Sequence, residues 1–232
     1  MAGIRSSKLL EILLPNLLIN LEGISQEDVF AAIDATTGDC DVTKLQGWRN
    51  RIDPEARSAA TAFLDAICAG HDSEVLAATV PDLMCSWKWP GRCDLCWICF
   101  DVVPAGPMVQ GTVLRDAWIH GHHGSILRAY DNEHIIGWFQ VASPETLMDD
   151  SERIALSNLP DEVLVFRGDS KDNPEQGISW TLDKTVAENF ANRIDSNPTI
   201  QGIGMLLERR IARKSILALI IERDEAEIIV GG

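Results

Sequence analysis

The stretch GISWTLDKTVAENFA, residues 177–191, decides the interpretation of the last third of the chain, because a strand pattern runs directly into a helix pattern. Ser179 and Thr181 stand two residues apart around Trp180, so their hydroxyls would share one face of a strand. Asp183 is a residue type preferred as a helix N-cap. The helix that follows would pack through Val186, Ala187, Phe190 and Ala191. The stretch therefore predicts an edge with two hydroxyls that stops at a helix cap.

Strand-like runs of apolar residues surround this stretch. The stretch itself predicts a strand over 177–183 and a helix over 184–193. The other predicted strands are EVLVFRG at 162–168, GMLLERRIA at 204–212, SILALIIERD at 215–224 and AEIIV at 226–230. Helices and strands mixed in this way place the chain in the α+β class.

The first two thirds of the chain have a different character. Helical spacing predicts helical structure over 7–35 with a break near Pro15, and a helix over 54–70 with Gly70 as the stop. Within 142–160 it predicts one helix that starts at Ser143 or Pro144, followed by a connection that ends at Pro160. Residues 85–139 hold five of the seven tryptophans and four of the six cysteines, in short runs broken by proline and glycine. We interpret them as mixed strand and loop, with LCWICFDVV at 95–103 as a buried strand.

Two polar features of the last third are candidates for chemistry. Arg167 ends an apolar strand and is followed by Gly168, which suits recognition of a phosphate or of ribose hydroxyls. An edge arginine paired with a carboxylate is the alternative. Glu225 and Glu227 would share one face of a strand, where mutual repulsion raises the pKa of one carboxyl group. Solvated surface charges are the alternative for this pair.

The order of these features resembles the ADP-ribosyltransferase family: FRG, then S-x-T running into a helix, then E-x-E before branched apolar residues. It is similar in particular to the arginine–serine–glutamate class, which includes cholera-toxin-like enzymes and small bacterial and phage toxins. The resemblance covers about residues 161–230, and SWTLDKTVAENFA is its strongest part. It implies an NAD-binding core over 156–232, in which two small sheets clasp NAD, preceded by an accessory helical and mixed region over 1–155.

The resemblance also implies roles for the polar residues of the last third. Arg167 would bind the phosphate or ribose of NAD, and Gly168 would lie against the nicotinamide amide. Glu227 would bond the ribose 2′-hydroxyl and stabilise the cation formed when nicotinamide leaves, and Glu225 would assist the incoming nucleophile. A fixed carboxylate beside a developing positive charge stabilises it electrostatically.

The resemblance implies that the hydroxyl edge of the strand predicted over 177–183 would hold the nicotinamide riboside. Ser179 would steady both this part of NAD and the catalytic glutamate, with Trp180 and Thr181 as further residues of the binding edge.

The cysteines and histidines of the middle region allow a second kind of site. Cys93 and Cys96 have the spacing of a zinc knuckle, and two histidines of IHGHHG at 119–124 would complete a tetrahedral zinc site. Cys96 and Cys99 repeat this spacing but share Cys96 with the first pair, so only one independent pair is present, and free cysteines are among the residues most often buried. We favour buried, reduced thiols over zinc.

Charge and the N-terminal segment limit the partners. The net charge is −15, with 11 basic and 22 acidic residues in 1–160 and 9 basic and 13 acidic residues in 161–232, which excludes broad binding to the nucleic acid backbone. The apolar run near the N-terminus is interrupted by Glu11 and Pro15, so we expect neither a signal peptide nor a membrane span. We expect a cytoplasmic protein with reduced thiols.

The function implied by the resemblance is mono-ADP-ribosylation: transfer of ADP-ribose from NAD to a protein or nucleic acid acceptor, with release of nicotinamide. An NAD glycohydrolase, in which water is the acceptor, is the alternative enzyme. A catalytically silent binding module on the same fold is the alternative from another class. Small members of the family are often toxins or effectors neutralised by a partner, which implies an antitoxin or regulator.

Overall fold

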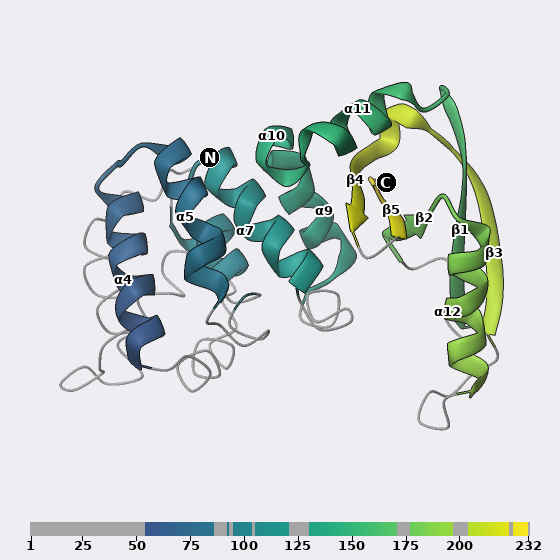
Figure 1. Cartoon of the computed structure of the whole chain (residues 1–232), viewed down its shortest axis with the longest axis horizontal. Helices are drawn as coiled ribbons and strands as arrows, with labels where there is room; N and C mark the ends of the chain where they lie inside the picture. Colours follow the sequence, from purple (N-terminus) through teal and green to yellow (C-terminus); the bar gives the residue numbers. More distant parts are fainter. Residues whose placement is uncertain are drawn as a thin grey trace. The chain divides into compact units, whose positions relative to one another are not determined.

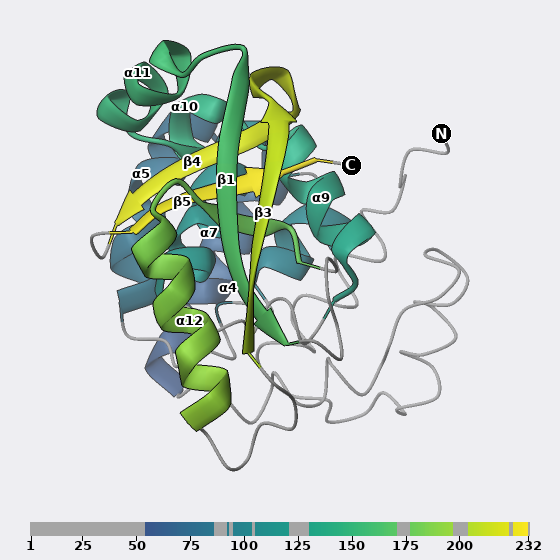
Figure 2. The ribbon, with the colours of Figure 1, turned by 90° about the vertical axis from the view of Figure 1, so that its right-hand side faces the viewer.

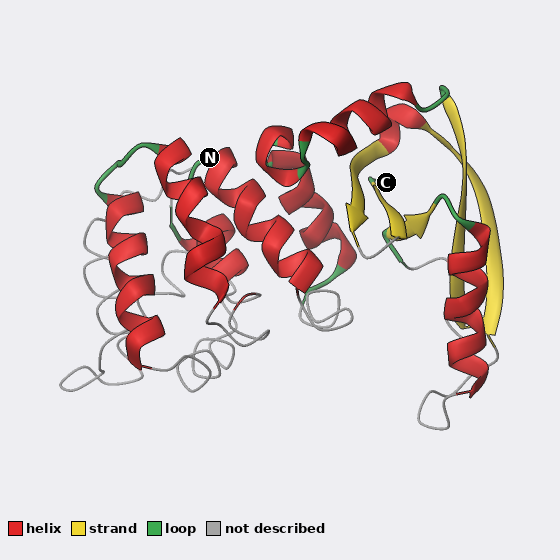
Figure 3. Cartoon of the chain, viewed as in Figure 1, coloured by secondary structure: helices red, strands yellow, loops and turns green. Residues whose placement is uncertain are grey.

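The computed structural model describes residues 54–85, 92, 95–103, 105–120, 130–170, 177–196, 204–222 and 225–231. Two compact units make up the chain, Met1–Ile126 and Leu127–Gly232. Helices occur in both units, and every strand of the described residues belongs to the second (Figure 3). The expected α+β class is confirmed, while the functional division near residue 155 stays a prediction.

The described part of the first unit is helical. Its elements are α4 (Pro54–Cys68), α5 (Ser73–Cys85), the π-helix η1 (Ile98–Val102) and α7 (Pro107–His120). Helix α5 packs against both α4 and α7, around buried side chains such as Leu64, Val80 and Leu114. The helix predicted over 54–70 is confirmed, and Gly70 follows it with a φ of 73°, a backbone conformation in which glycine is favoured. The helical structure predicted over 7–35 lies outside the described residues.

The interpretation of residues 85–139 as mixed strand and loop is wrong for the part that the structure describes. Residues 95–97 are helical and continue into η1, where a buried strand over 95–103 was expected. Leu95, Cys96, Ile98 and Cys99 are all buried, so the segment is apolar on nearly every side. A short run of this kind has no periodicity that separates a buried strand from a buried helix.

Three helices begin the described part of the second unit: α9 (Asn132–Val141), α10 (Pro144–Leu147) and α11 (Asp150–Asn158). The start at Ser143 and Pro144 is confirmed, because Ser143 is the N-cap of α10. The single helix predicted within 142–160 is wrong, because the chain is extended at Met148 and Asp149. Asp149 accepts a hydrogen bond from the backbone N–H of Glu152 and caps a new helix.

One antiparallel sheet of five strands follows, in the order β3-β1-β2-β5-β4. The strands confirm the five predicted runs, with shifted ends: β1 (Glu162–Ser170), β2 (Ser179–Thr181), β3 (Gly204–Ala212), β4 (Ile216–Glu222) and β5 (Glu225–Val230). Among the described residues, a single register pair, Phe166 with Thr181, joins the β1–β3 ribbon to the other three strands. Figure 2 shows β1 and β3 running in a different direction from β4 and β5. The 3₁₀ turn η2 (Arg213–Ser215) connects β3 to β4.

Helix α12 (Lys184–Ser196) lies along β1 and β3 (Figure 1). The contact is close because two strand positions have no side chain. A Cβ atom at Gly168 would meet backbone atoms of Ala187 and Ala191, and one at Gly204 would meet the backbone of Ala191. We call Gly168, Gly204, Ala187 and Ala191 the glycine–alanine seam. The seam brings the helix against the strand that carries Arg167.

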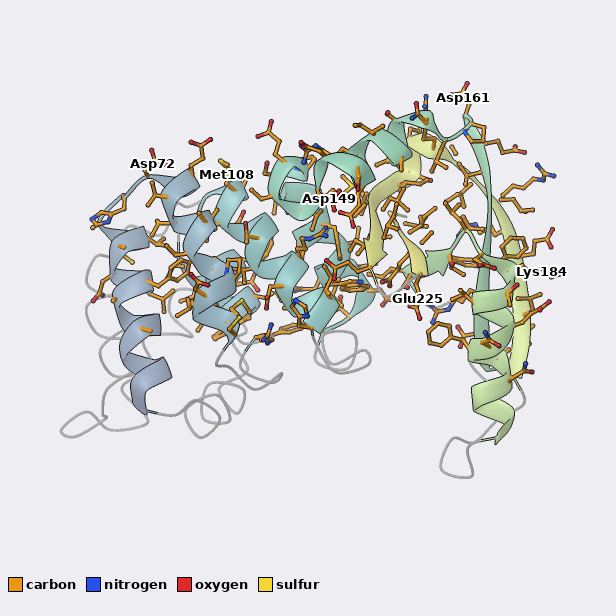
Figure 4. The ribbon with its side chains drawn as sticks, viewed as in Figure 1. Asp72, Met108, Asp149, Asp161, Lys184 and Glu225 are labelled. Atoms are coloured by element: carbon orange, nitrogen blue, oxygen red, sulfur yellow. The ribbon has the colours of Figure 1, made fainter. Side chains whose placement is uncertain are left out.

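The outer edge of β4 is covered by side chains rather than by another strand. The N–H of Ile221 donates to Glu152 Oε1 at 2.7 Å, and the N–H of Leu219 donates to Met148 Sδ at 3.3 Å. The second oxygen of Glu152 accepts from the N–H of Asp149 at 2.8 Å; Asp149, labelled in Figure 4, immediately precedes α11. Glu152 is 0% exposed, so its two backbone hydrogen bonds offset the cost of burying a carboxyl group.

In the part of the chain that the structure describes, no helix combines the length and the apolar character needed to cross a membrane.

Candidate functional site

Ser179 and Glu227 are brought together by the pairing of β2 with β5. Thr181 is the register partner of Glu227 and Ser179 is the partner of Ile229, so Ser179 lies diagonally from Glu227 on one face. The hydroxyl of Ser179 donates a hydrogen bond to Glu227 Oε1. Both residues are half-buried. The serine therefore fixes the direction of a carboxylate that stays partly accessible.

Arg167 reaches the same strand from β1. Its Nη1 donates to the backbone carbonyl of Ser179 at 2.6 Å, and its Nε donates to Asp169 Oδ2 at 2.6 Å. The side chains of Arg167 and Asp169 are 21% and 14% exposed. The guanidinium is thus tied to the backbone of the residue whose hydroxyl orients Glu227. Arg167, Ser179 and Glu227, separated by up to 60 positions in the sequence, form one connected group.

Glu225 lies at the start of β5, where Figure 4 labels it, two residues before Glu227 on the same face. Its register partner on β4 is Glu222, so a third carboxylate shares this face. Like charges directly opposite one another destabilise a strand pair, and a cationic or proton-bearing group placed among them relieves that repulsion. Glu222 was not singled out from the sequence, because its approach to Glu225 depends on the β4–β5 register.

Three other predicted NAD-binding residues have structural tasks. The Thr181 hydroxyl is buried and accepts from the N–H of Asp183 at 3.0 Å, at the start of α12. Trp180 is buried on the face opposite to Ser179, and its Nε1 donates to the carbonyl of Gly177 at 3.2 Å. Gly168 belongs to the glycine–alanine seam. Of the predicted hydroxyl pair, the Ser179 side chain contacts Glu227 and the Thr181 side chain supports the helix.

The capping role predicted for Asp183 is confirmed. Its carboxylate accepts from the N–H of Thr185 at 2.7 Å, and its carbonyl accepts from the N–H of Ala187 at 3.2 Å. The helix therefore begins immediately after β2, as the quoted stretch predicts. This tight connection fixes the end of β2 close to the end of β5 that carries Glu227.

The predicted zinc candidates lie apart from this group in the sequence. Cys93 is outside the described residues, as are His122 and His123. Cys96 is buried, and its thiol donates to the carbonyl of Val113 at 3.4 Å. Burial raises the pKa of the neighbouring Cys99 thiol, which disfavours the thiolate that a metal requires. Among the described residues, no cluster of three or more histidine, cysteine, aspartate or glutamate side chains is arranged to hold a metal ion.

The chemistry open to the connected group follows from its charges. A guanidinium recognises anionic groups such as phosphates, and a fixed carboxylate stabilises a positive charge that develops next to it. The β4–β5 end adds carboxylates that can accept a proton from a nucleophile. Comparison with models of known protein families, with curated proteins and with solved structures finds no match for this chain.

Proposed function

We propose that the chain is a mono-ADP-ribosyltransferase that moves ADP-ribose from NAD to a macromolecular acceptor. The observation that carries the proposal is the connected group itself. Ser179 donates to the Glu227 carboxylate while its own carbonyl holds Arg167. The order of motifs in the sequence suits this chemistry, and Ser179 contacts both of the other residues: Glu227 through its hydroxyl and Arg167 through its backbone carbonyl.

The proposed reaction uses the chain's residues in three ways. Arg167 binds a phosphate of NAD through a charge-assisted hydrogen bond. Glu227 stabilises the positive charge that develops on the ribose as its bond to nicotinamide breaks and the bonding electrons leave with nicotinamide. Glu225 accepts the proton of the acceptor's nucleophile as that nucleophile bonds to the ribose carbon. Ser179 keeps the Glu227 carboxylate in one orientation throughout.

The five strands form one hydrogen-bonded sheet, where the resemblance implies two small sheets, but the two parts of this sheet carry different residues of the group. The β1–β3 ribbon carries Arg167, and the β2–β5–β4 part carries Ser179 and the glutamates. Among the described residues, the two parts are joined by one register pair, Phe166 with Thr181, and by the hydrogen bond from Arg167 to the Ser179 carbonyl. A binding site shared by two sheet parts positions groups from both against one ligand. We therefore propose the ADP-ribosyltransferase fold for the second unit, with a toxin or effector role in the cytoplasm and an antitoxin or regulator as partner.

The deciding experiment incubates the purified chain with labelled NAD and whole-cell extract. Label in protein or in nucleic acid indicates transfer and identifies the acceptor class. Free ADP-ribose alone indicates the NAD glycohydrolase instead. Unchanged NAD indicates a silent binding module and would contradict the proposal.

Substitution of the two glutamates tests their separate roles. Glu227→Gln keeps size and removes charge, so transfer and hydrolysis should both fall about a hundredfold or more. Glu225→Gln should reduce transfer far more than hydrolysis, because water needs less positioning. Glu188→Gln is the matched control: Glu188 is exposed on α12 and its carboxylate lies 3.9 Å from Lys184, so activity should not change. A fully active Glu227→Gln variant would overturn the proposal.

A further inference from the structure

The guanidinium of Arg167 is held on several sides, which the order of motifs does not require. Asp169 lies two residues along the same strand, on the same face, and takes the Nε–H at 2.6 Å. The carbonyl of Ser179 takes Nη1 from the neighbouring strand at 2.6 Å. Within the described residues, Nη2 makes no hydrogen bond to the protein. The two contacts fix the plane of the group and leave donors for a ligand.

A third side is closed by backbone at Gly177. A Cβ atom built at this residue would fall inside 3.0 Å of Cζ, Nη1 and Nη2 of Arg167, a separation that real Cβ atoms essentially never show. The backbone of Gly177 therefore lies directly against the guanidinium. No residue with a side chain fits there while Arg167 keeps its place. The carbonyl of Gly177 is itself held by Trp180 Nε1 at 3.2 Å, which anchors this backbone to the core.

We propose that Asp169 and Gly177 are positioning residues for Arg167: together with the Ser179 carbonyl they hold the guanidinium in one orientation for an NAD phosphate. This inference rests on the proposed function. A free arginine side chain loses rotamer entropy when it is immobilised. Contacts that immobilise it before the ligand arrives remove most of that cost from binding. Neither residue acts on the reacting atoms.

The geometry separates this role from a purely structural one. At Gly177 an added methyl group meets the far end of a flexible side chain, which can swing away at little cost in stability. Gly177→Ala should therefore displace Arg167 while the fold stays intact. Asp169→Asn keeps the shape of the side chain and removes the charge that holds Nε. Gly137→Ala is the matched control, because a Cβ atom there meets nothing within 4 Å.

The first measurement observes the arginine directly. In the full-length protein, the Nε–H of Arg167 should give a slowly exchanging signal in ¹⁵N-resolved NMR spectra, assigned by its loss in Arg167→Lys. The signal should disappear or exchange at least tenfold faster in Gly177→Ala and Asp169→Asn, and should be unchanged in Gly137→Ala. Melting temperatures report whether each variant folds. An unchanged signal in both folded variants would overturn the positioning role, whatever the protein's activity.

The second measurement links the position to the ligand. In steady-state NAD cleavage, Gly177→Ala and Asp169→Asn should raise KM for NAD about tenfold and leave kcat within about threefold, because lost ground-state binding raises KM alone. Arg167→Ala should raise KM at least as much. If Arg167→Ala raises KM and the two variants do not, the positioning inference is wrong and the proposed function stands. If wild type does not cleave NAD, the proposed function fails and this inference fails with it.

Discussion

Replacing Gly168 by alanine tests whether the glycine–alanine seam sets the distance between α12 and β1. The new Cβ would lie 2.5 Å from the backbone nitrogen of Ala191 and 2.7 Å from Cβ of Phe190, and closer still to the carbonyl oxygen of Ala187. Ordinary van der Waals contact begins at 3.4 Å. To relieve the contact with Ala191 alone, the helix would have to move by about 0.9 Å, the difference between 3.4 and 2.5 Å.

A shift of this size in a packed interface costs about 1–3 kcal/mol, the range for overpacking a core. Urea unfolding followed by circular dichroism should show this loss for Gly168→Ala. Gly137→Ala, in the open surroundings of α9, should instead gain up to about 1 kcal/mol from helix propensity. If Gly168→Ala is as stable as wild type and loses only affinity for NAD, the seam is the wrong account of this glycine, and the nicotinamide contact implied by the resemblance is the better one.

Two further predictions concern buried groups outside the proposed site. In Glu152→Gln, the new amide nitrogen would face the N–H of Ile221 or of Asp149, so one hydrogen bond is lost. The free energy of unfolding should fall by about 1–3 kcal/mol relative to the exposed control Glu145→Gln. Equal urea midpoints for the two variants would refute the edge contact. Burial raises the pKa of the Cys99 thiol above its ordinary value of 9.0, so on raising the pH the unfolded chain loses this proton before the folded chain does. The free energy of unfolding should therefore be unaffected by this thiol below about pH 9 and should decline as the pH rises further. Cys99→Ala should decline less between pH 8 and pH 10, and an identical decline would show that this thiol does not contribute.

The strands and the helix of the last third could be predicted because their patterns are local. Alternating and branched apolar residues mark β1, β4 and β5, and Asp183 marks the start of α12. The break between α10 and α11 was missed, although Asp149 with Glu152 three residues later is a capping box in the sequence.

The middle of the chain was misinterpreted for a different physical reason. Segment 95–103 is buried on successive positions, and its branched and sulfur-containing residues suit a strand as well as a helix. Helix α7 begins at Pro107 and contains Gly111, two residue types that usually mark turns. Helix α7 packs against α5 and against η1, and neither neighbour can be identified from the local pattern.

The connected group could be predicted in part. The sequence predicts that Arg167, Ser179 and Glu227 act together only through the resemblance, because they lie on three strands whose register is a tertiary property. Asp169 had a local signal, since residues two apart on a strand share a face, and it was missed. The contact of Gly177 with Arg167 had no local signal in the sequence, because a glycine just before a strand occurs for many reasons.

The covered edge of β4 determines which shorter fragments of the chain can be expressed in folded form. A cut at the predicted start of the NAD-binding core, between residues 155 and 156, would separate Met148 and Glu152 from Leu219 and Ile221. A fragment beginning at 156 would expose two backbone donors along a bare, apolar strand, the usual starting point for pairing between molecules. Such a fragment would be recovered as aggregate, and its inactivity would say nothing about catalysis. The smallest piece that keeps the edge closed includes α10 and α11 along with the sheet.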